Sequence, residues 1–173
     1  NPESDQLQLD FTVSALAVKA APLARRAAKA AVAVEADLSA EDWYGLGLEL
    51  EAVAPAEARD AYRRALELDA HHADAHVNLG RLLQEDRRMA EAEKHYRQAL
   101  AGDPQHVTAA FNLGSVLEDL GRVAEAIEAY RKALGVDSRL ADAHYNLACL
   151  YDRLGKKAAA LRHFGAYRRL TER

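Results

Sequence analysis

Residues 73–106 read ADAHVNLGRLLQEDRRMAEAEKHYRQALAGDPQH, and this stretch decides the fold because the chain repeats it. A step of 34 residues takes Asn78 to Asn112 and then to Asn146. Four further series keep the same step: Leu79, Leu113 and Leu147; Gly80 and Gly114; Ala92, Ala126 and Ala160; Tyr96, Tyr130 and Phe164. Self-similarity at a fixed period of this length predicts an array of repeated structural units.

Each repeated unit has the pattern of two short amphipathic helices with a polar join between them. Apolar residues recur at helical spacing on both sides of the joins, which are residues 86–88, 120–122 and 154–156. Gly121 and Gly155 suit the left-handed residue that often follows the end of a helix. Small residues such as Gly80 and Ala92 recur where two helices must cross closely. We therefore expect an all-α fold, a stack of helix-turn-helix units.

The repeats divide the chain into an N-terminal segment, residues 1–38, and a four-unit domain, residues 39–173. The units are expected at residues 39–72, 73–106, 107–140 and 141–173. In the first unit, Trp43, Leu46 and Gly47 precede their counterparts in the second unit by 33 residues rather than 34. Because one residue is missing, we expect a tighter connection between the two helices of the first unit.

The N-terminal segment carries two weaker signals. Apolar and polar residues alternate over residues 7–13, which indicates a short strand or an extended tail. Proline suits the first turn of a helix, so we expect an alanine-rich helix over about residues 22–36, beginning at Pro22. Ser39, which lies three residues before Asp42 and has acidic residues in the turn that follows, is typical of a helix N-cap.

The residues at these spacings resemble the signature of the tetratricopeptide repeat family. The second unit carries the signature at Leu79, Gly80, Leu83, Ala92, Tyr96, Ala99 and Pro104. In the last unit, Ala148 and Tyr167 replace the glycine and alanine of the signature. The resemblance covers residues 40–173, and it implies a right-handed superhelix of helix pairs with a concave, peptide-binding inner wall.

In this family the first helix of each pair faces the concave side, and the residue two before the signature glycine points inward. That residue is Asn78, Asn112 or Asn146 here, which is similar to the asparagine ladder in the repeat arm of O-linked N-acetylglucosamine transferase. A side-chain amide both donates and accepts hydrogen bonds, so the ladder would bind the backbone of an extended peptide. Alternatively, these amides satisfy neighbouring groups of the protein itself. The other expected contact residues are Tyr44, Val77, Arg81, Glu85, Phe111 and Tyr145.

Charge narrows the class of partner. Acidic residues outnumber basic ones at the expected inner positions, and no lysine lies among them. The heat-shock-chaperone class of the family clamps a terminal carboxylate with lysines, so the sequence instead favours a neutral or basic extended partner. The net charge of −4 provides no basic field for nucleic acid, and no apolar run is long enough for a membrane span.

The sequence shows no catalytic constellation, so we expect no enzymatic activity and no cofactor. His72 and His76, four residues apart, could share a metal ion with His71, but no acidic or thiol partner completes a site, and we expect no metal. His144 follows His76 by 68 residues, twice the period, which indicates packing or helix-start roles. Cys149, the only cysteine, lacks an activating neighbour and is compatible with a cytoplasmic protein.

The sequence thus predicts a protein interaction scaffold that binds an extended peptide in a concave groove. The alternative is self-association, as the arm of a larger bacterial regulator or enzyme whose other domain is absent. The first unit has 8 acidic and 3 basic residues, a net charge of −5, whereas the last has 3 acidic and 7 basic residues, a net charge of +4. These opposite charges would steer head-to-tail association, and Leu161, Phe164 and Tyr167 would form an exposed apolar face at the end of the stack.

Overall fold

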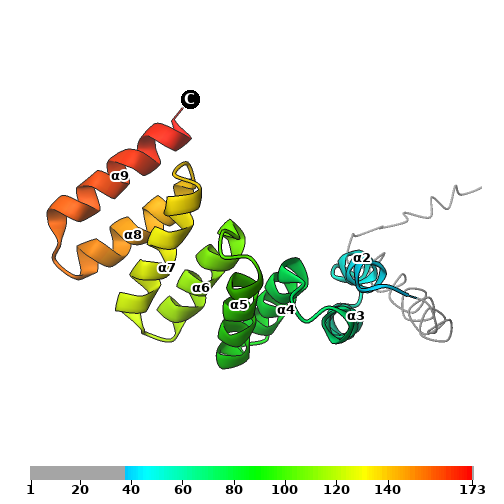
Figure 1. Ribbon diagram of the computed structural model, residues 1–173. Coiled ribbons are helices and arrows are strands. Elements are labelled where there is room, and N and C mark those ends of the chain that lie inside the picture. The colour runs from blue at the N-terminus through cyan, green and yellow to red at the C-terminus, as the bar shows by residue number, and fades with distance from the viewer. Residues whose placement is uncertain (1–37, 173) are drawn as a thin grey trace, which may run out of the picture.

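The computed structural model describes residues 38–172, which form eight α-helices in four consecutive pairs (Figure 1). The first two pairs are α2 (Ala40–Leu50) with α3 (Pro55–Leu68) and α4 (Ala73–Glu85) with α5 (Met89–Gly102). The last two are α6 (Val107–Asp119) with α7 (Val123–Val136) and α8 (Ala141–Arg153) with α9 (Lys157–Thr171). The expectation of an all-α stack of helix-turn-helix units is confirmed.

The helix pairs stack in a row rather than around a common centre. Each helix packs against the other helix of its pair, and the second helix of one pair packs against the first helix of the next. Figure 1 shows this row running from α2 and α3 at one end to α8 and α9 at the other. Most of the buried apolar residues consequently form one cluster that extends along the stack from Trp43 to Leu150.

Each of the first three pairs closes around a glycine on its first helix and a tyrosine on its second. The facing residues are Gly47 with Tyr62, Gly80 with Tyr96, and Gly114 with Tyr130. A Cβ atom at Gly80 or Gly114 would lie 2.8 or 2.6 Å from the facing ring, so only glycine permits this close crossing. In the last pair Ala148 and Phe164 take these positions, and Phe164 is 36% exposed whereas the three tyrosines are at most 1% exposed.

The joins within the last three pairs lie at residues 86–88, 120–122 and 154–156, as expected. The left-handed position is filled by Gly121 (φ 73°) and Gly155 (φ 72°), which confirms the role expected of both glycines. Arg87 takes the same conformation in the second pair (φ 63°), although it is not a glycine. The chain reverses tightly there, and the backbone N–H of Arg88 donates to the carbonyl of Leu83 at 2.9 Å.

The expectation of a tighter connection between the two helices of the first pair is wrong. Helix α2 has 11 residues whereas α4, α6 and α8 each have 13, and residues 51–54 form a connection longer than the other joins. The missing residue is therefore taken from the helix. No residue in this connection has a positive φ, and the N–H groups of Val53 and Ala54 both donate to the carbonyl of Leu50. Without a left-handed residue, the chain needs more residues to reverse.

The N-cap expected at Ser39 is confirmed as a reciprocal pair of hydrogen bonds. The N–H of Asp42 donates to Ser39 Oγ at 3.2 Å, and the N–H of Ser39 donates to the Asp42 carboxylate at 2.9 Å. The strand expected over residues 7–13 and the helix over 22–36 lie outside the described residues, so the division at residue 38 stays a prediction. Within residues 38–172, no helix has the length and apolar character needed to cross a bilayer.

Candidate functional site

The three asparagines of the repeated stretch lie on α4, α6 and α8, at the junction of each pair with the preceding one. All three are half-buried. Asn78 Nδ2 donates to Tyr62 Oη at 3.3 Å, and Asn146 Nδ2 donates to Tyr130 Oη at 3.1 Å. Asn112 lies within hydrogen-bonding reach of the hydroxyl of Tyr96. Asn78 and Asn146 are therefore held by the tyrosine of the preceding pair, and Asn112 lies beside the equivalent tyrosine.

The tyrosine hydroxyls set the direction of these bonds. Each hydroxyl donates to an acceptor at the end of the first helix of its own pair: Tyr62 to Glu51 Oε1 (2.6 Å), Tyr96 to Gln84 Oε1 (3.0 Å) and Tyr130 to Glu118 Oε2 (3.3 Å). Having donated its only proton, the hydroxyl of Tyr62 or Tyr130 offers only lone pairs to the asparagine. The amide must therefore present Nδ2 to the tyrosine, so Oδ1 and the second N–H lie outside this bond.

Burial keeps the three tyrosine hydroxyls protonated. Desolvation raises the pKa of Tyr62, Tyr96 and Tyr130 well above the usual range of a phenol. The neighbouring carboxylates act in the same direction, since the bond to Glu51 further raises the pKa of Tyr62. The hydroxyls are thus permanent donors near neutral pH, and the orientation of the asparagines does not depend on pH there.

The acceptors of these tyrosines are themselves bonded to the next pair. Arg81 Nη2 donates to Glu51, and Arg153 Nη2 donates to Glu118 Oε1 at 2.6 Å. At the middle junction Gln84 Nε2 donates to Ser115 Oγ (3.2 Å) and to Asp119 Oδ2 (3.0 Å). These bonds join each pair to its neighbour on the asparagine side of the stack.

The arginines on this side are neutralised, and several carboxylates remain exposed. Arg81, an expected contact residue, binds Glu51 and also Glu85 Oε1 at 2.7 Å. Among the positions expected to face the partner, Glu85, Asp119 and Asp142 are exposed. The surface that carries the asparagines is therefore acidic.

The expected apolar contact residues have different environments. Tyr44 packs on Tyr62, with ring centroids 5.8 Å apart, and Phe111 packs on Tyr130 at 5.4 Å. Both are half-buried, so part of each ring is open to a partner. The expectation for Val77 is wrong, because its side chain is 4% exposed. It belongs to a core cluster with two alanines of α5 and α6, whose small side chains leave room for it.

Tyr145 is the most open of the expected contact residues. Its side chain is 47% exposed, and its ring lies 6.1 Å from that of Phe164 and 5.2 Å from that of Tyr167, centroid to centroid. Phe164 and Tyr167 lie on α9, and Leu161 on that helix is 71% exposed. Tyr145 and α9 thus form an aromatic end face, which we define as residues Tyr145, Leu161, Phe164 and Tyr167.

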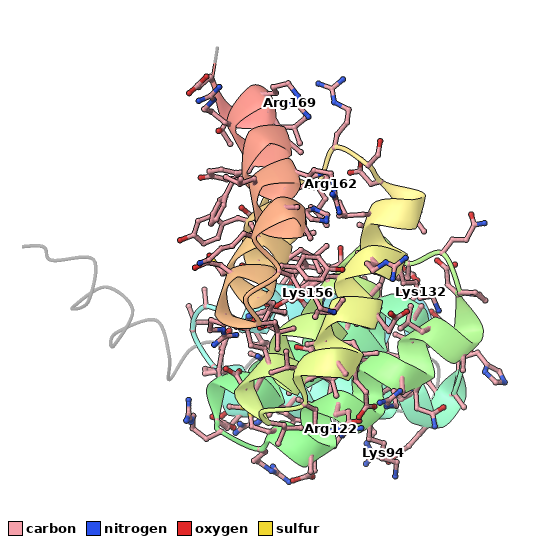
Figure 2. All side chains as sticks on the ribbon, turned by 90° about the vertical axis from the view of Figure 1, so that its left-hand side faces the viewer. Lys94, Arg122, Lys132, Lys156, Arg162 and Arg169 are labelled. Carbon is pink, nitrogen blue, oxygen red and sulfur yellow. The ribbon has the colours of Figure 1, made fainter. Side chains whose placement is uncertain are left out.

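Helix α9 is also the most basic helix of the described part of the chain. Its charged residues are Lys157, Arg162, Arg168 and Arg169, with no carboxylate among them. Figure 2, which looks at the end of the stack formed by α9, shows Arg162 and Arg169 extending from it. Helix α2, at the opposite end, carries Glu41, Asp42 and Glu49 and no basic residue.

The histidines first considered as metal ligands do not converge on one point. His72 caps α4, because its Nδ1 accepts from the N–H of Ala75 at 3.2 Å, while its Nε2 lies 3.3 Å from Glu41. His76 is buried and pairs instead with His95. Over residues 38–172, no group of three or more His, Cys, Asp or Glu residues is arranged to hold a metal ion.

Sequence reasoning missed the tyrosine hydroxyls and the helix-capping histidines. The available signal was tyrosine rather than phenylalanine at positions 62, 96 and 130, each with Glu or Gln 11 or 12 residues earlier. His106 caps α6 as His72 caps α4, with its Nδ1 3.2 Å from the N–H of Ala109. Histidine is not among the usual N-cap residues, so the sequence pattern did not predict that His72 and His106 cap helices.

Three comparisons relate the chain to known proteins. Family models described as tetratricopeptide repeat match residues 49–106 and 77–144, and a further one matches residues 141–165. A search of the curated proteins gave no match.

The similar solved structures support the fold. A crystal structure of MamA has a TM-score of 0.78 and 23% sequence identity, covering 85% of this chain and 86% of that one. A structure of MamA from Desulfovibrio magneticus RS-1, residues 41 to the end, has a TM-score of 0.70 and 20% identity, covering 87% and 94%. These identities establish a common fold only. Since the family models together match more than half of the sequence, the chain belongs to the tetratricopeptide repeat family.

Proposed function

We propose that the chain is a cytoplasmic protein interaction scaffold that holds an extended, neutral or basic peptide against the first helices of its pairs. Tetratricopeptide repeats serve as scaffolds for protein–protein interaction, which supports the general class. The finer proposal rests on one observation, which is that Asn78 and Asn146 are oriented by the preceding tyrosines and that Asn112 repeats their position one helix pair apart from each.

In this proposal each asparagine makes two bonds to the peptide backbone. The N–H not used by the tyrosine donates to a peptide carbonyl, and Oδ1 accepts from a peptide N–H. Because Tyr62 and Tyr130 already fix the side chains of Asn78 and Asn146, little side-chain entropy remains to be lost on binding. Backbone bonding of this kind holds the peptide without selecting its sequence.

Side chains around the ladder provide the selection. Tyr44, Phe111 and Tyr145 offer partly exposed aromatic surface for apolar groups of the peptide. Glu85, together with the other exposed inner carboxylates, disfavours an acidic peptide and favours a basic one. Arg81 contributes through its bond to Glu51, since that ion pair joins the first two helix pairs beneath the peptide.

A selected peptide tests the proposal. Unstructured peptides that bind the pure chain would be selected from a displayed random library, and their dissociation constants measured for the wild type and for N78A/N112A/N146A. The triple variant loses six hydrogen bonds, each worth at least about 0.5 kcal/mol, so it should bind at least about a hundredfold more weakly. Unchanged affinity in a variant with a native circular dichroism spectrum would contradict the proposal.

The matched control removes the tyrosine hydroxyls and keeps the amides. The variant Y62F/Y96F/Y130F should lose stability, because Glu51 and its counterparts lose a donor, yet it should bind the selected peptide much more tightly than the asparagine variant does. If the two triple variants lose affinity equally, the asparagines act only by joining the helix pairs.

Self-association is a second candidate, and the aromatic end face favours it. Leu161 and Tyr145 expose apolar surface beside the basic residues of α9, whereas α2 at the other end is acidic. Head-to-tail association would bring the two ends together, and salt would weaken it. Sedimentation velocity at several concentrations and salt levels tests this candidate. A strict monomer under all conditions would exclude it, and L161D should abolish any association that is seen.

A further inference from the structure

Two pairs of histidines bridge the helices of the second and fourth helix pairs. His76 Nδ1 on α4 lies 2.9 Å from His95 Nδ1 on α5, and His144 Nδ1 on α8 lies 2.9 Å from His163 Nδ1 on α9. The ring centroids are 5.1 Å apart and the ring planes are inclined by 40° in both cases. The same arrangement is thus built twice, two repeats apart.

The outer nitrogens determine which ring donates. His76 Nε2 lies 3.1 Å from the carbonyl oxygen of Ala70, and His144 Nε2 lies 3.1 Å from that of Ser138. A carbonyl only accepts, so these Nε2 atoms carry the protons and the neutral rings have a lone pair on Nδ1. His95 and His163 must therefore donate from Nδ1, and their own Nε2 atoms are left without a proton.

The geometry is that of a hydrogen bond between imidazoles rather than of a metal site. With nitrogens 2.9 Å and centroids 5.1 Å apart, each nitrogen points along the line that joins the two rings. Two ligands of one metal ion would instead point at a common third position beside that line. The rings of His144 and His163 have the same separation.

Histidine occurs at both of these positions or at neither. The third helix pair has Ala110 and Ala129 at the corresponding places, and the first has Trp43 and Ala61. At these two positions, no helix pair of the described chain has one histidine without the other. The two rings therefore work as a unit, because a single buried imidazole would lack its partner.

Charged groups on the neighbouring elements act on the rings. Around the first pair they are Arg63 on α3; Asp69, His71 and His72 in the connection to α4; and Glu91 and Lys94 on α5. Around the second pair they are Arg131 on α7 and Arg162 on α9. Glu67 on α3 also lines the hollow beside the first pair, and Tyr151 on α8 stacks on His163 with ring centroids 5.6 Å apart. Asp69 and Glu91 favour the protonated rings, whereas the arginines and Lys94 disfavour them.

Burial is the main influence on protonation. Desolvation lowers the pKa of His95 to about 4, and His76, Lys94 and Arg63 add to this effect. Desolvation also lowers the pKa of His76 and of His163. A hollow of about 430 Å³, lined by His76, His95 and Leu66 among others, gives solvent access to the first pair. Solvent protons can thus reach His76 and His95, although burial disfavours the protonated form of both rings.

We propose that the two imidazole pairs make the second and fourth helix pairs sensitive to acid, each staying closed while it binds at most one proton and opening when both rings are protonated. A first proton on Nε2 of His95 leaves its Nδ1–H bond to His76 intact. A second proton, on His76 Nδ1, places two N–H groups and two positive charges face to face. Since His76 and His144 lie two residues before Asn78 and Asn146, opening would also displace two of the ladder amides.

The direction of the pH effect follows from the lowered pKa values. An unfolded histidine has a pKa of about 6.5, so above that pH neither state binds protons at His76, His95 or His163, and the stabilisation from these three rings is fully present. Between about 6.5 and 4 the unfolded chain binds more protons than the folded chain, and stability falls as the pH falls. His95 alone should increase the unfolding equilibrium constant roughly twentyfold between pH 7 and pH 5.

Denaturant unfolding of the full chain at pH 7 and pH 5 tests the proposal. The variant H76A/H95A/H144A/H163A, which copies the alanines of the third helix pair, should lose at least tenfold of the acid-induced increase in the unfolding constant. The control His106→Asn removes a histidine that contacts neither pair and keeps a side-chain acceptor for the N–H of Ala109, so it should retain the wild-type pH dependence. Equal pH dependence in the wild type and the quadruple variant would overturn the proposal.

Two further measurements on the wild type keep the proposal testable if the variant does not fold. Nitrogen-detected NMR should show the Nε2–H tautomer for His76 and His144 and the Nδ1–H tautomer for His95 and His163. Normal titration of His95 near pH 6.5 would overturn the proposal. Zinc ions added at pH 7 should leave the unfolding midpoint unchanged; an increase that depends on the four histidines would assign the pairs to metal binding instead.

Discussion

Arg87 occupies a backbone conformation that the equivalent positions of the next two helix pairs give to glycine. Its φ of 63° is left-handed, as are those of Gly121 and Gly155. A side chain in this conformation costs about 1 kcal/mol, and its replacement by glycine removes that strain. Arg87→Gly should therefore raise the free energy of unfolding by up to about 1 kcal/mol, as measured by urea denaturation.

The converse substitution is the control for Arg87. Gly121→Arg should destabilise the chain by about 1 kcal/mol or more, because it introduces the same strain into the third pair. The space around Gly121 is open, and a Cβ atom added there would meet no other atom within 4 Å, so any loss comes from the backbone alone. A less stable Arg87→Gly variant would show that the arginine side chain makes up for its backbone strain.

At the scale of single residues, the sequence predicted which side chains recur but not what they bind. The periodicity of Asn78 was plain, yet its partner Tyr62 lies 16 residues earlier on another helix. Spacing along one helix indicates a common face, whereas a bond between helices depends on their crossing geometry. Val77 shows the same limit, because its burial depends on the small residues of two other helices.

Two glycines of helix α2 separate packing from helix propensity. No atom lies within 4 Å of a Cβ placed at Gly45, whereas a Cβ at Gly47 would collide with the ring of Tyr62. Gly45→Ala should stabilise the chain by about 0.5–1 kcal/mol through the helix itself. Gly47→Ala should cost about 1–3 kcal/mol, because the tyrosine must move.

Thermal or urea unfolding of the two alanine variants checks this contrast. Both substitutions add one methyl group to the same helix, so each is the control for the other. Equal stability of the two variants would contradict the close crossing of α2 and α3.

At the scale of elements, helix positions were predictable and one helix end was not. The joins at residues 120–122 and 154–156 followed from Gly121 and Gly155, since glycine there has a direct conformational reason. The first pair has no such residue, and the deletion could be accommodated in the helix or in the connection. In the structure, helix α2 ends at Leu50, and the N–H groups of Val53 and Ala54 donate to the Leu50 carbonyl. The sequence pattern does not predict these bonds.

Stability should decrease towards α9 along the stack. Helix α7 buries five side chains, whereas α9 buries only Ala160 and leaves Leu161 71% exposed. Regions with few buried apolar contacts open first. Amide hydrogen exchange should therefore be faster in α9 than in α7. Equal protection of the two helices in a dilute monomer would contradict this account, and protection that rises with concentration would indicate self-association.

For the whole molecule, the fold was predictable because it is local. Each helix pair contacts mainly its neighbours, so one repeated stretch contains most of the information for the stack. The partner was not predictable to the same degree. The acidic character of the asparagine surface depends on which arginines are neutralised, and Arg81 and Arg153 are bound by glutamates of the preceding pairs.

The central claim is that the asparagine ladder binds the backbone of an extended peptide. The most direct measurement is the NMR spectrum of the side-chain amides of Asn78, Asn112 and Asn146 during titration with a selected peptide. We predict that all three amide signals shift together and saturate at one equivalent of peptide. Saturable binding of the peptide with all three signals unchanged would contradict the claim.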